Sequence, residues 1–584
     1  MASKKTKKYM CDFETTTDIN DCRVWAWCLV DIETAETVSI GNDIDTLFEF
    51  LQDKNSVVYF HNLKFDGEFI LSWLTRNKYK YNDGKVKKEK TFDTLITDGG
   101  VFYSITVIFK VMNKRYHKVV FYDSLKKLPF KVATISKAFN LADEKLSIDY
   151  EAFRPVGHEL TEEERQYIVN DCRIVAQALK IQFDKGLTKM TNASDALNHY
   201  KELTPQFEKW FPEFPLEMDS DIRRAYKGGF TYLNPKYKNK RVKEGITLDV
   251  NSLYPSVMYE KMLPYGYPIF FEGKYEEDPH YPLYIVRIQC EFKLKKNHIP
   301  TIQLKNNRAF IETEYLTSSN GEIVEMTLTN VDLQLMLDHY DTPYIEYICG
   351  YKFKGAVGMF KDYIDYWGHI KETSTGAMRQ LAKLQLNSCY GKFATNPKTR
   401  KKIPFKDADG VVRYELSEVE FRPPIYTAMG CFITAYAREK TIRSGQTVYD
   451  RFIYADTDSL HLEGYDIPEG LEIHPTRLGA WKHEGSFCDS VYIRAKTYME
   501  TMIEYESDTL ANYCKRLNKG FEVWRVDDNI KYLNTIVTCA GMPENVKKGV
   551  TYDNFHTGSV FTGKLVPKRC VGGVVLVDRP FTIK

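Results

Sequence analysis

The sequence predicts a multidomain protein that combines α/β and α+β architecture, and three observations support this. The chain has 584 residues, which is too long for one hydrophobic core and enough for about four domains. Hydrophobic residues make up 43% and charged residues 27% of the chain, the composition of a globular protein rather than a disordered one. Strand-like and helix-like segments alternate over residues 9–190, whereas a strand-rich region begins near residue 245.

The predicted elements follow in chain order. Strand-like runs lie at 9–13, 57–60 and 118–122, and Thr161 followed by three glutamates is a capping box that begins a helix. A stretch rich in proline and aromatic residues lies at 204–215. Further elements are a helical segment at 359–391, a hairpin at 400–418 with its turn at Asp409-Gly410, a strand pair at 447–465 and an apolar strand at 573–577.

Several classes of protein are excluded by composition. No apolar run approaches the roughly 18 residues that a membrane helix requires, and Asp12 and Glu14 occur where the apolar part of a signal peptide should begin. We therefore expect a cytoplasmic protein without a membrane partner. The 12 cysteines include no C-x-x-C pair, so neither a zinc cluster nor a disulfide scaffold is indicated. A net charge of +2 does not by itself indicate a nucleic-acid partner.

A first group of acidic residues lies in the N-terminal third. Asp12 and Glu14 are two residues apart on a predicted strand and therefore point to the same face. Adjacent carboxylates repel each other unless a cation lies between them, although an exposed strand face would also explain the pair. Asp66 is expected at a strand edge, where the chain leaves a strand and enters a helix, and Tyr167 and Asp171 share one face of a helix. Four carboxylates could hold two metal ions about 4 Å apart and hydrolyse a phosphodiester, with the phenol orienting the water.

A second group of acidic residues lies in the strand-rich region. Asp249 ends a predicted strand and is followed by Ser252, Tyr254 and a proline, in the pattern D-x-x-S-L-Y-P. Asp456 and Asp458 occur as D-T-D, and we expect both on one face of a strand. A single D-T-D arises by chance in a chain of this length, but its combination with the first pattern does not.

A helical segment between these acidic motifs presents a cationic face. Arg379, Lys383, Asn387 and Tyr390 are spaced by 4, 4 and 3 residues and so lie on one side of a helix. Two cations, an amide and an aromatic ring suit a nucleoside triphosphate. A solvated helix face is the alternative interpretation.

Together these motifs resemble a known family. D-F-E at 12–14, N-x-x-x-D at 62–66 and Y-x-x-x-D at 167–171 resemble the DEDDy proofreading 3′–5′ exonucleases. The motifs around Asp249, at 383–391 and at 454–459 resemble motifs A, B and C of family-B DNA polymerases. Y-K-G-G at 226–229, T-x-x-A-R at 434–438 and K-T-Y at 496–498 resemble the protein-primed branch of that family.

The resemblance implies a fold and a domain order. We expect an RNase H-like exonuclease domain followed by a right-hand polymerase with palm, fingers and thumb and two insertions. The expected boundaries are 1–190 for the exonuclease, 191–260 and 424–539 for the palm, 261–358 for the first insertion, 359–394 for the fingers, 395–423 for the second insertion, a β-hairpin, and 540–584 for the thumb.

The resemblance also implies roles for individual residues. The expected catalytic residues of the exonuclease are Asp12, Glu14, Asp66, Tyr167, Asp171 and the assisting Lys145, and those of the polymerase are Asp249, Asp456 and Asp458. The seven acids and the Val250 carbonyl would hold two Mg²⁺ ions per site, with Mn²⁺ as a substitute. The expected nucleotide-binding residues are Tyr254, which would exclude a ribose 2′-hydroxyl, Lys371, Lys383, Asn387 and Tyr390. The expected DNA-binding residues are Thr15, Tyr59, His61, Asn62, Phe65, Ser124, Leu125, Tyr226, Gly228, Gly229, Ser252, Arg379, Thr434, Arg438, Lys496 and Tyr498.

The implied activity is DNA-templated DNA synthesis that replicates a linear viral genome from a terminal protein as primer, with processive strand displacement and proofreading. Expected partners are primer-template DNA, single-stranded DNA, deoxynucleoside triphosphates and the terminal protein. The chain would act as a monomer in the cytoplasm of an infected bacterial host.

Three alternatives share part of these features. A family-B polymerase primed by nucleic acid would have the same acids, and labelling of a partner protein's hydroxyl by the first nucleotide would distinguish it. A nuclease whose C-terminal half only binds DNA would lack the second acidic group. A binding module without catalysis would keep seven mutually repelling acids for no benefit.

Overall fold

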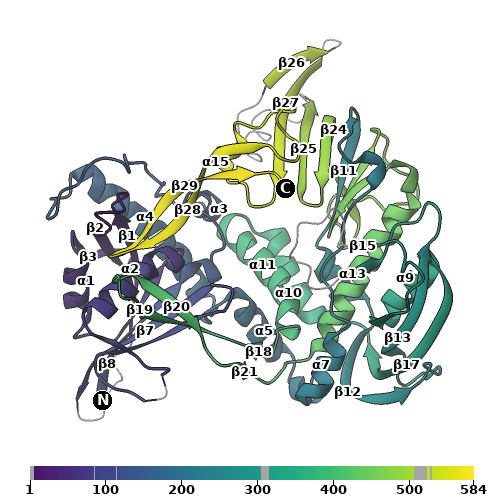
Figure 1. Ribbon diagram of the computed structural model, residues 1–584, viewed down its shortest axis with the longest axis horizontal. Coiled ribbons are helices and arrows are strands. Elements are labelled where there is room, and N and C mark those ends of the chain that lie inside the picture. Colours follow the sequence, from purple (N-terminus) through teal and green to yellow (C-terminus); the bar gives the residue numbers. More distant parts are fainter. Residues whose placement is uncertain (1–5, 85, 113–114, 304–314, 506–521, 527–528) are drawn as a thin grey trace.

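The computed structural model describes residues 6–84, 86–112, 115–303, 315–505, 522–526 and 529–584. Two sheet-based regions lie at opposite ends of the molecule (Figure 1), and helices and two long hairpins connect them. No helix among the described residues is long and apolar enough to span a bilayer.

An eight-stranded sheet forms the N-terminal region, with strand order β3-β2-β1-β4-β8-β7-β6-β5. Its central strands β1, β4 and β8 are parallel, and antiparallel strands flank them. The three strands predicted in this region are confirmed as β1, β4 and β8. The strands are β1 (Lys7–Thr15), β2 (Val24–Asp31), β3 (Thr37–Gly41), β4 (Ser56–Phe60), β5 (Lys80–Tyr81), β6 (Thr91–Ile96), β7 (Phe102–Met112) and β8 (Arg115–Asp123).

Helices α1 (Ile44–Leu51), α2 (Leu63–Arg76), α3 (Val132–Phe139) and α4 (Glu162–Asp184) accompany this sheet, together with η1 (Ser124–Lys126). The predicted capping box at the start of α4 is confirmed. The Glu164 amide donates to Thr161 Oγ1 at 3.2 Å, and the Thr161 amide donates to Glu164 Oε2 at 3.0 Å. Helix α4 packs on β1 and β2, which brings its buried face to the acids of β1.

The segment rich in proline and aromatic residues, 204–215, contains α6 (Phe207–Trp210) and lies between α5 (Asn192–Leu203) and α7 (Leu216–Arg223). Buried aromatic rings of α5 and of this segment pack on residues from later in the chain. Tyr200 stacks on Phe360 at 4.3 Å, and Phe214 contacts Tyr426 at 4.9 Å. These contacts join the N-terminal region to the rest of the core.

A nine-stranded antiparallel sheet carries the second acidic group, in the order β26-β27-β25-β24-β11-β23-β22-β9, with β10 paired to β24. Helices α8 (Leu253–Glu260) and α13 (Thr427–Thr447) pack against each other, and α13 contacts β22 and β23. The strands are β9 (Thr231–Leu233), β10 (Arg241–Val242), β11 (Gly245–Val250), β22 (Phe452–Asp456), β23 (Ser459–Glu463), β24 (Trp481–Arg494), β25 (Thr497–Tyr505), β26 (Glu522–Val526) and β27 (Asn529–Cys539), with η2 (Pro235–Tyr237) and η3 (Tyr449–Arg451) between them.

A four-stranded sheet with its own hydrophobic core lies beside the nine-stranded sheet. Its order is β12-β17-β13-β16, and α9 packs on β13, β16 and β17. Its elements are β12 (Leu263–Glu272), β13 (Leu283–Leu294), β16 (Val324–Thr329), α9 (Asn330–His339) and β17 (Tyr340–Ala356), with the short pair β14 (Ile302–Gln303) and β15 (Tyr315–Leu316).

The predicted helical segment at 359–391 is divided into α10 (Lys361–Thr373), α11 (Gly376–Ser388) and α12 (Tyr390–Phe393). The break between α10 and α11 falls at Gly376, whose φ of +53° suits a residue without a side chain. Helices α10 and α11 pack on each other, and α11 also contacts α3, α4 and α5.

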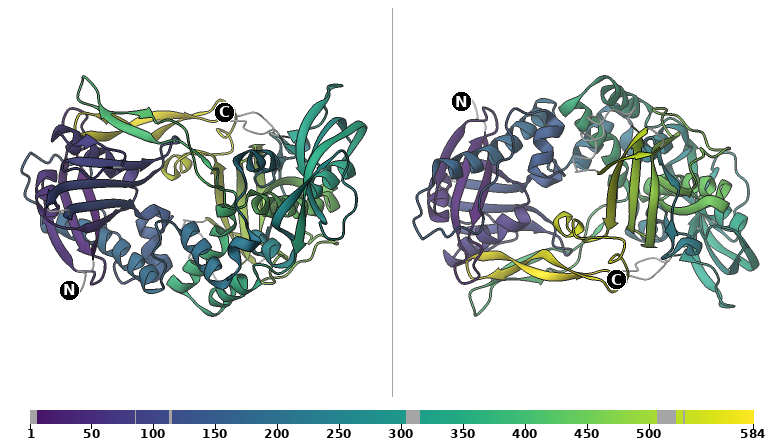
Figure 2. Two further views of the ribbon diagram at one scale, coloured as in Figure 1. Left: turned by 90° about the horizontal axis from the view of Figure 1, so that it is seen from below. Right: turned by 90° about the horizontal axis from the view of Figure 1, so that it is seen from above.

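Two hairpins of the C-terminal half reach the N-terminal sheet (Figure 2). The first contains β18 (Lys398–Thr399) paired with β21 (Glu420–Phe421) and β19 (Lys402–Lys406) paired with β20 (Val412–Leu416). Its predicted turn is confirmed, and Gly410 has φ +85°. The second follows α15 (Glu544–Lys547) and consists of β28 (Val560–Cys570) and β29 (Gly573–Thr582), so the strand predicted at 573–577 is confirmed and is longer.

Candidate active sites

The second acidic group is assembled by neighbouring strands of the nine-stranded sheet. Asp249 lies on β11 opposite Ser459 of β23, and the Val250 amide donates to the Asp458 carbonyl at 2.8 Å. Asp456 ends β22, and Thr457 and Asp458 form the turn before β23. The prediction that Asp456 and Asp458 share a strand face is therefore wrong, because the turn separates them.

Because of this turn, the Asp456 and Asp458 side chains have different surroundings. Asp458 lines the same pocket as Asp249, whereas Asp456 accepts from Thr231 Oγ1 at 3.0 Å and pairs with Lys496 at 3.2 Å. Thr457 has φ +59°, and a Cβ on Gly229 would lie 2.6 Å from its hydroxyl. A glycine is therefore required at 229 for the neighbouring loop to approach this turn.

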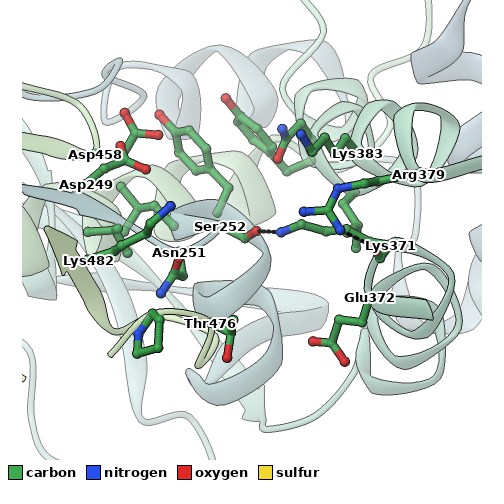
Figure 3. Close-up of a pocket in the computed structure, with 17 residues that line it drawn as sticks. Asp249, Asn251, Ser252, Lys371, Glu372, Arg379, Lys383, Asp458, Thr476 and Lys482 are labelled. Carbon is green, nitrogen blue, oxygen red and sulfur yellow. Dashed lines mark hydrogen bonds between the residues drawn. The ribbon is translucent and has the colours of Figure 1, made fainter. Parts of the chain in front are cut away.

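The pocket between the nine-stranded sheet and helices α10 and α11 has a volume of about 890 Å³. Figure 3 shows the two aspartates at one end and the cations of the helices at the other. The predicted cationic face is confirmed, because all four of its members line the pocket. The lining residues are Asp249, Val250, Asn251, Ser252, Leu253, Tyr254, Lys371, Glu372, Arg379, Lys383, Leu386, Asn387, Tyr390, Asp458, Pro475, Thr476 and Lys482.

Hydrogen bonds hold the cationic end of the pocket in place. Lys371 Nζ donates to Ser252 Oγ at 2.7 Å, and Arg379 Nη1 donates to the Lys371 carbonyl at 2.6 Å (Figure 3). Ser252 has φ +56° at the start of α8. On the same side, the rings of Tyr254 and Tyr390 stack with centroids 4.3 Å apart.

The pKa values of the acidic and basic residues in the pocket are shifted in the directions that bound ions of opposite charge would reverse. Burial and the neighbouring Asp458 carboxylate raise the pKa of Asp249 to about 7. Burial also raises the pKa of Asp458. Burial lowers the pKa values of Lys371 and Lys383, and repulsion from the neighbouring Arg379 guanidinium lowers both further. A ligand that places cations beside the aspartates and phosphates beside the lysines would stabilise the charged forms of both groups.

Lys482 is a pocket residue that the sequence motifs did not indicate. It pairs in register with Asp249 across β11 and β24, and its ammonium opposes the rise in the pKa of Asp249. Only the pairing of these two strands could have indicated its position, since no local pattern marks it.

The first acidic group is assembled around β1. Asp12 and Glu14 point to the same side of the strand, as predicted, and the Asp12 carboxylate helps to raise the pKa of Glu14. Asp66 lies in the first turn of α2 and not at a strand edge, which corrects its predicted placement. Tyr167 and Asp171 lie one turn apart on α4 and are buried.

Burial and mutual repulsion dominate this site. Burial and Asp171 raise the pKa of Asp12 to about 7. Burial and the Asp12 carboxylate raise the pKa values of Glu14 and Asp66 well above their ordinary range. Such a cluster is stable at neutral pH only when protonated or when paired with cations.

Lys145 joins this cluster from a loop. Its Nζ donates to Tyr167 Oη at 3.0 Å and to Asp171 Oδ2. Tyr150 and Tyr167 share a hydrogen bond of 2.5 Å between their hydroxyls. The other oxygen of Asp171, Oδ1, is buried without a partner, so this carboxylate retains an acceptor for a cation or a water.

Both donor sets fit divalent metal ions. Among the described residues, no three aspartate, glutamate, histidine or cysteine side chains lie close enough to enclose an ion by themselves. Each site instead offers a carboxylate pair, with the unpartnered Asp171 oxygen in the first group. Hard carboxylate and carbonyl oxygens are the ligands that Mg²⁺ uses together with substrate oxygens and waters.

The residues predicted to grip a single strand divide into two sets. Asn62 is exposed at the start of α2, while Thr15, Phe65 and Leu125 are partly exposed. His61 makes hydrogen bonds to Ser124 Oγ at 2.9 Å and to the Phe130 carbonyl at 2.7 Å.

Two members of this set are buried in the structure. Tyr59 packs between Tyr122 and Phe183, with centroids 5.7 Å away in each case, and Ser124 is fully buried. Both side chains support the neighbouring surface, and their contact with DNA stays a prediction.

Two further predicted DNA contacts, Thr434 and Arg438 on α13, are also buried. Arg438 donates to both Asp332 oxygens at 2.7–3.1 Å and to the carbonyls of Lys227 and Gly228 at 3.0 and 2.8 Å. Direct contact of these two side chains with DNA stays a prediction. Arg438 holds the 226–229 loop, which the sequence motif alone did not indicate.

The remaining predicted contacts are accessible beside the second acidic group. Gly228 and Lys496 are exposed, and Tyr226, Gly229 and Tyr498 are partly exposed. Tyr498 packs on Tyr454 at 5.2 Å.

The N-terminal region is a mixed sheet with a buried acid cluster, and it is joined to a second sheet whose aspartates face a cationic helix. This combination defines the class of DNA polymerases that carry an exonuclease domain. The family model described as DNA polymerase type B, organellar and viral, matches residues 49–159 and 144–473. The chain belongs to this family and is a DNA-directed DNA polymerase. Its fold is an RNase H-like exonuclease domain followed by a right-hand polymerase.

Individual relatives cover nearly the whole chain. The DNA polymerase of Bacillus phage B103 is 48% identical over 582 residues, 99% of this chain and 100% of the relative. The structure of phi29 DNA polymerase with primer-template DNA and incoming nucleotides matches with a TM-score of 0.92 at 47% identity, over 99% of this chain and 100% of that chain. The structure of phi29 DNA polymerase with single-stranded DNA matches with a TM-score of 0.91 at 46% identity over the same shares.

Proposed function

We propose that this chain is the replicative polymerase of a phage with a linear genome, that it uses a terminal protein as primer, and that it proofreads. The observation that carries the proposal is the charge division of the 890 Å³ pocket, with Asp249 and Asp458 at one end and Lys371, Arg379 and Lys383 at the other. This arrangement suits a nucleoside triphosphate whose reacting phosphate faces the acids.

In the polymerase site, Asp249, Asp458 and the Val250 carbonyl would hold Mg²⁺, with Asp456 nearby. The metal supplies activation of the primer hydroxyl and neutralisation of the triphosphate charge, and Mn²⁺ can substitute for it. Lys371 and Lys383 bind the phosphates, with Arg379 and Asn387 beside them. Tyr254 fills the space of a ribose 2′-hydroxyl, and Tyr390 contacts the nascent base pair.

In the exonuclease site, Asp12, Glu14, Asp66 and Asp171 would hold Mg²⁺, which would bind the scissile phosphate. Tyr167 orients the attacking water through its hydroxyl, and Lys145 stabilises the negative charge that develops. A mispaired primer end frays and reaches this site as a single strand, which the accessible Thr15, Asn62, Phe65 and Leu125 contact.

The proposed division of the chain follows the predicted boundaries. The exonuclease is 1–190, the palm 191–260 and 424–539, the fingers 359–394 and the thumb 540–584. The insertions at 261–358 and 395–423 receive the terminal protein and clamp DNA. We propose a monomer that acts in the cytoplasm of the infected bacterium on primer-template DNA.

Primer extension from a 3′ mismatch tests the two-site proposal. Asp458→Ala should abolish synthesis and retain degradation of the single-stranded end, whereas Asp12→Ala should do the reverse. Each loss should be on the order of 10³-fold or more, because a metal ligand of the reacting phosphate is removed. Loss of both activities in either folded variant would contradict separate sites.

Protein priming is tested by incubation with labelled deoxynucleoside triphosphates and the phage's own terminal protein. A phosphodiester should form between a hydroxyl of that protein and the first nucleotide, with release of pyrophosphate. Extension of DNA primers without any labelling of the terminal protein would favour the nucleic-acid-primed alternative.

A further inference from the structure

Glu68 is a buried acid of α2 that takes no part in either proposed reaction, and it connects three distant segments. Its Oε1 accepts from Arg569 Nε of β28 at 2.8 Å, and its Oε2 accepts from Tyr414 Oη of β20 at 2.9 Å. The Arg569 guanidinium also lies 4.6 Å from the centre of the Tyr414 ring. A single carboxylate therefore ties both C-terminal hairpins to the exonuclease domain.

The tip of the β28–β29 hairpin is closely fitted to the same domain. A Cβ on Gly572 would lie 2.0 Å from the Cys22 carbonyl oxygen, and a Cβ on Gly573 would lie 2.4 Å from the Phe69 ring. Val574 and Val575 beside this turn belong to the hydrophobic core of the N-terminal sheet. The tip is thus docked through backbone contact and apolar burial.

The β19–β20 hairpin is attached next to it. Val412 is buried in the same core, the Asp98 amide donates to the Arg400 carbonyl at 3.1 Å, and Thr94 Oγ1 donates to the Lys402 carbonyl at 3.4 Å. On the other side of the molecule, α11 packs against α3 and α4. The N-terminal sheet is therefore connected to the rest of the chain by two routes. One route is the contact of α11 with α3 and α4, and the other is the two hairpins, which close a ring of contacts (Figures 1 and 2).

We propose that Glu68 is the latch of this ring: it holds the two hairpin tips closed around DNA, and DNA enters or leaves when the Glu68–Arg569–Tyr414 contact opens. This inference rests on the proposed function, in which the insertion at 395–423, which contains β19 and β20, clamps DNA. Glu68 is buried and Arg569 is partly exposed, so loss of either partner leaves the buried Glu68 carboxylate with an unmet hydrogen bond and weakens the attachment of both hairpins.

Glu68→Gln tests the latch, with Asp53→Asn as the control, because Asp53 is an exposed exonuclease carboxylate that pairs with Lys110. Extension of a primer on a long circular template, with excess competitor DNA added at the start, measures the product length per binding event. We expect Glu68→Gln to shorten products about tenfold, which corresponds to the loss of one charged hydrogen bond. Single-nucleotide insertion and single-strand degradation should stay within about twofold of wild type, which also shows that the variant is folded.

Tyr414→Phe removes only the hydroxyl and should shorten products less than Glu68→Gln does. Products of wild-type length from both variants would overturn the latch. Short products from the wild-type protein itself, with normal insertion, would contradict the processivity in the proposed function and the latch with it.

Two thiols beside the latch allow the ring to be closed covalently. Cys22 and Cys570 are both free and buried, and the turn that follows Cys570 packs on Cys22, since a Cβ on Gly572 would lie 3.8 Å from the Cys22 Cβ. Diamide, an azo oxidant, accepts two electrons and two protons from the pair, so that an S–S bond forms and the N=N bond becomes a hydrazide N–N bond. The resulting disulfide would close the polypeptide from residue 22 to 570 into a covalent loop.

Oxidation after loading on primed circular DNA should leave the polymerase attached to the circle in detergent, whereas linear DNA should be released. Cys570→Ser should be released from both. Peptide mapping should find the Cys22–Cys570 disulfide. Its absence, or release of the cross-linked protein from circular DNA, would overturn closure of the ring at this point.

Discussion

Tyr254 stacks on Tyr390 with ring centroids 4.3 Å apart and an angle of 19° between the rings. One ring comes from α8, directly after the strand that carries Asp249, and the other from α12 at the end of the cationic helix. The stack joins the two sides of the nucleotide pocket and leaves little freedom to either ring, so the wall beside the sugar has a defined position.

Tyr254→Val should weaken the exclusion of ribonucleotides, because the ring that fills the space of the 2′-hydroxyl is removed. We expect the ratio of kcat/KM for ribo- over deoxynucleotides to rise about 100-fold, the discrimination typical of a filled pocket. Single-nucleotide insertion measures both values. Tyr254→Phe retains the ring and should keep the discrimination, and an unchanged ratio in the valine variant would show that another residue forms the wall.

Lys482→Ala should weaken nucleotide binding, because this ammonium lies in the pocket beside Asp249. We expect KM for the nucleotide to rise about tenfold, as for the loss of one charge-assisted phosphate contact. Steady-state insertion kinetics measure this change. Lys361→Ala, an exposed lysine of α10 outside the pocket, is the control and should leave KM unchanged. A KM for Lys482→Ala that equals that of the control would show that Lys482 does not bind the nucleotide.

Deletion of residues 399–420 should abolish long strand-displacing products and leave the filling of short gaps intact. The deletion removes β19 and β20, which connect the central helices to the exonuclease sheet, while the residues of the nucleotide pocket are retained. Product lengths on a primed circle and on a short gap are compared by gel electrophoresis. Products of equal length with and without the hairpin would contradict this role.

The stability of α4 should depend on pH through Glu164. Although burial opposes it, Arg154, His158 and the Thr161 amide lower the pKa of Glu164 to about 2. The charged form is therefore favoured in the folded state, and its contribution is present above the unfolded pKa of about 4.3 and is lost as the pH falls towards 2. Glu164→Gln preserves the capping geometry but removes the charge.

We expect Glu164→Gln to lower the free energy of unfolding by about 2 kcal/mol at pH 7. The difference from wild type should shrink between about pH 5 and pH 2, where wild-type Glu164 becomes protonated. Urea unfolding across this range measures it. A difference that stays constant down to pH 2 would show that the carboxylate charge does not contribute.

Motifs with local geometry could be predicted from the sequence. The capping box of α4, the hairpin turn at Asp409-Gly410 and the cationic face of α11 each depend on spacing within a few residues. Side-chain burial could not be predicted in the same way. Arg438 carries a motif typical of DNA contact, yet Asp332, more than a hundred positions earlier in the chain, binds it in the interior.

By itself, the sequence determined which acids and cations this polymerase possesses and on which kinds of element they lie, because those features follow from short-range periodicity and motif spelling. Tertiary structure alone decided that Asp458 turns towards Asp249 and that Lys482 joins them, since strand pairing sets both positions. It also decided that Glu68 meets Tyr414 and Arg569, which are 346 and 501 residues away. Contacts across such separations depend on how whole domains pack, and no local pattern encodes them.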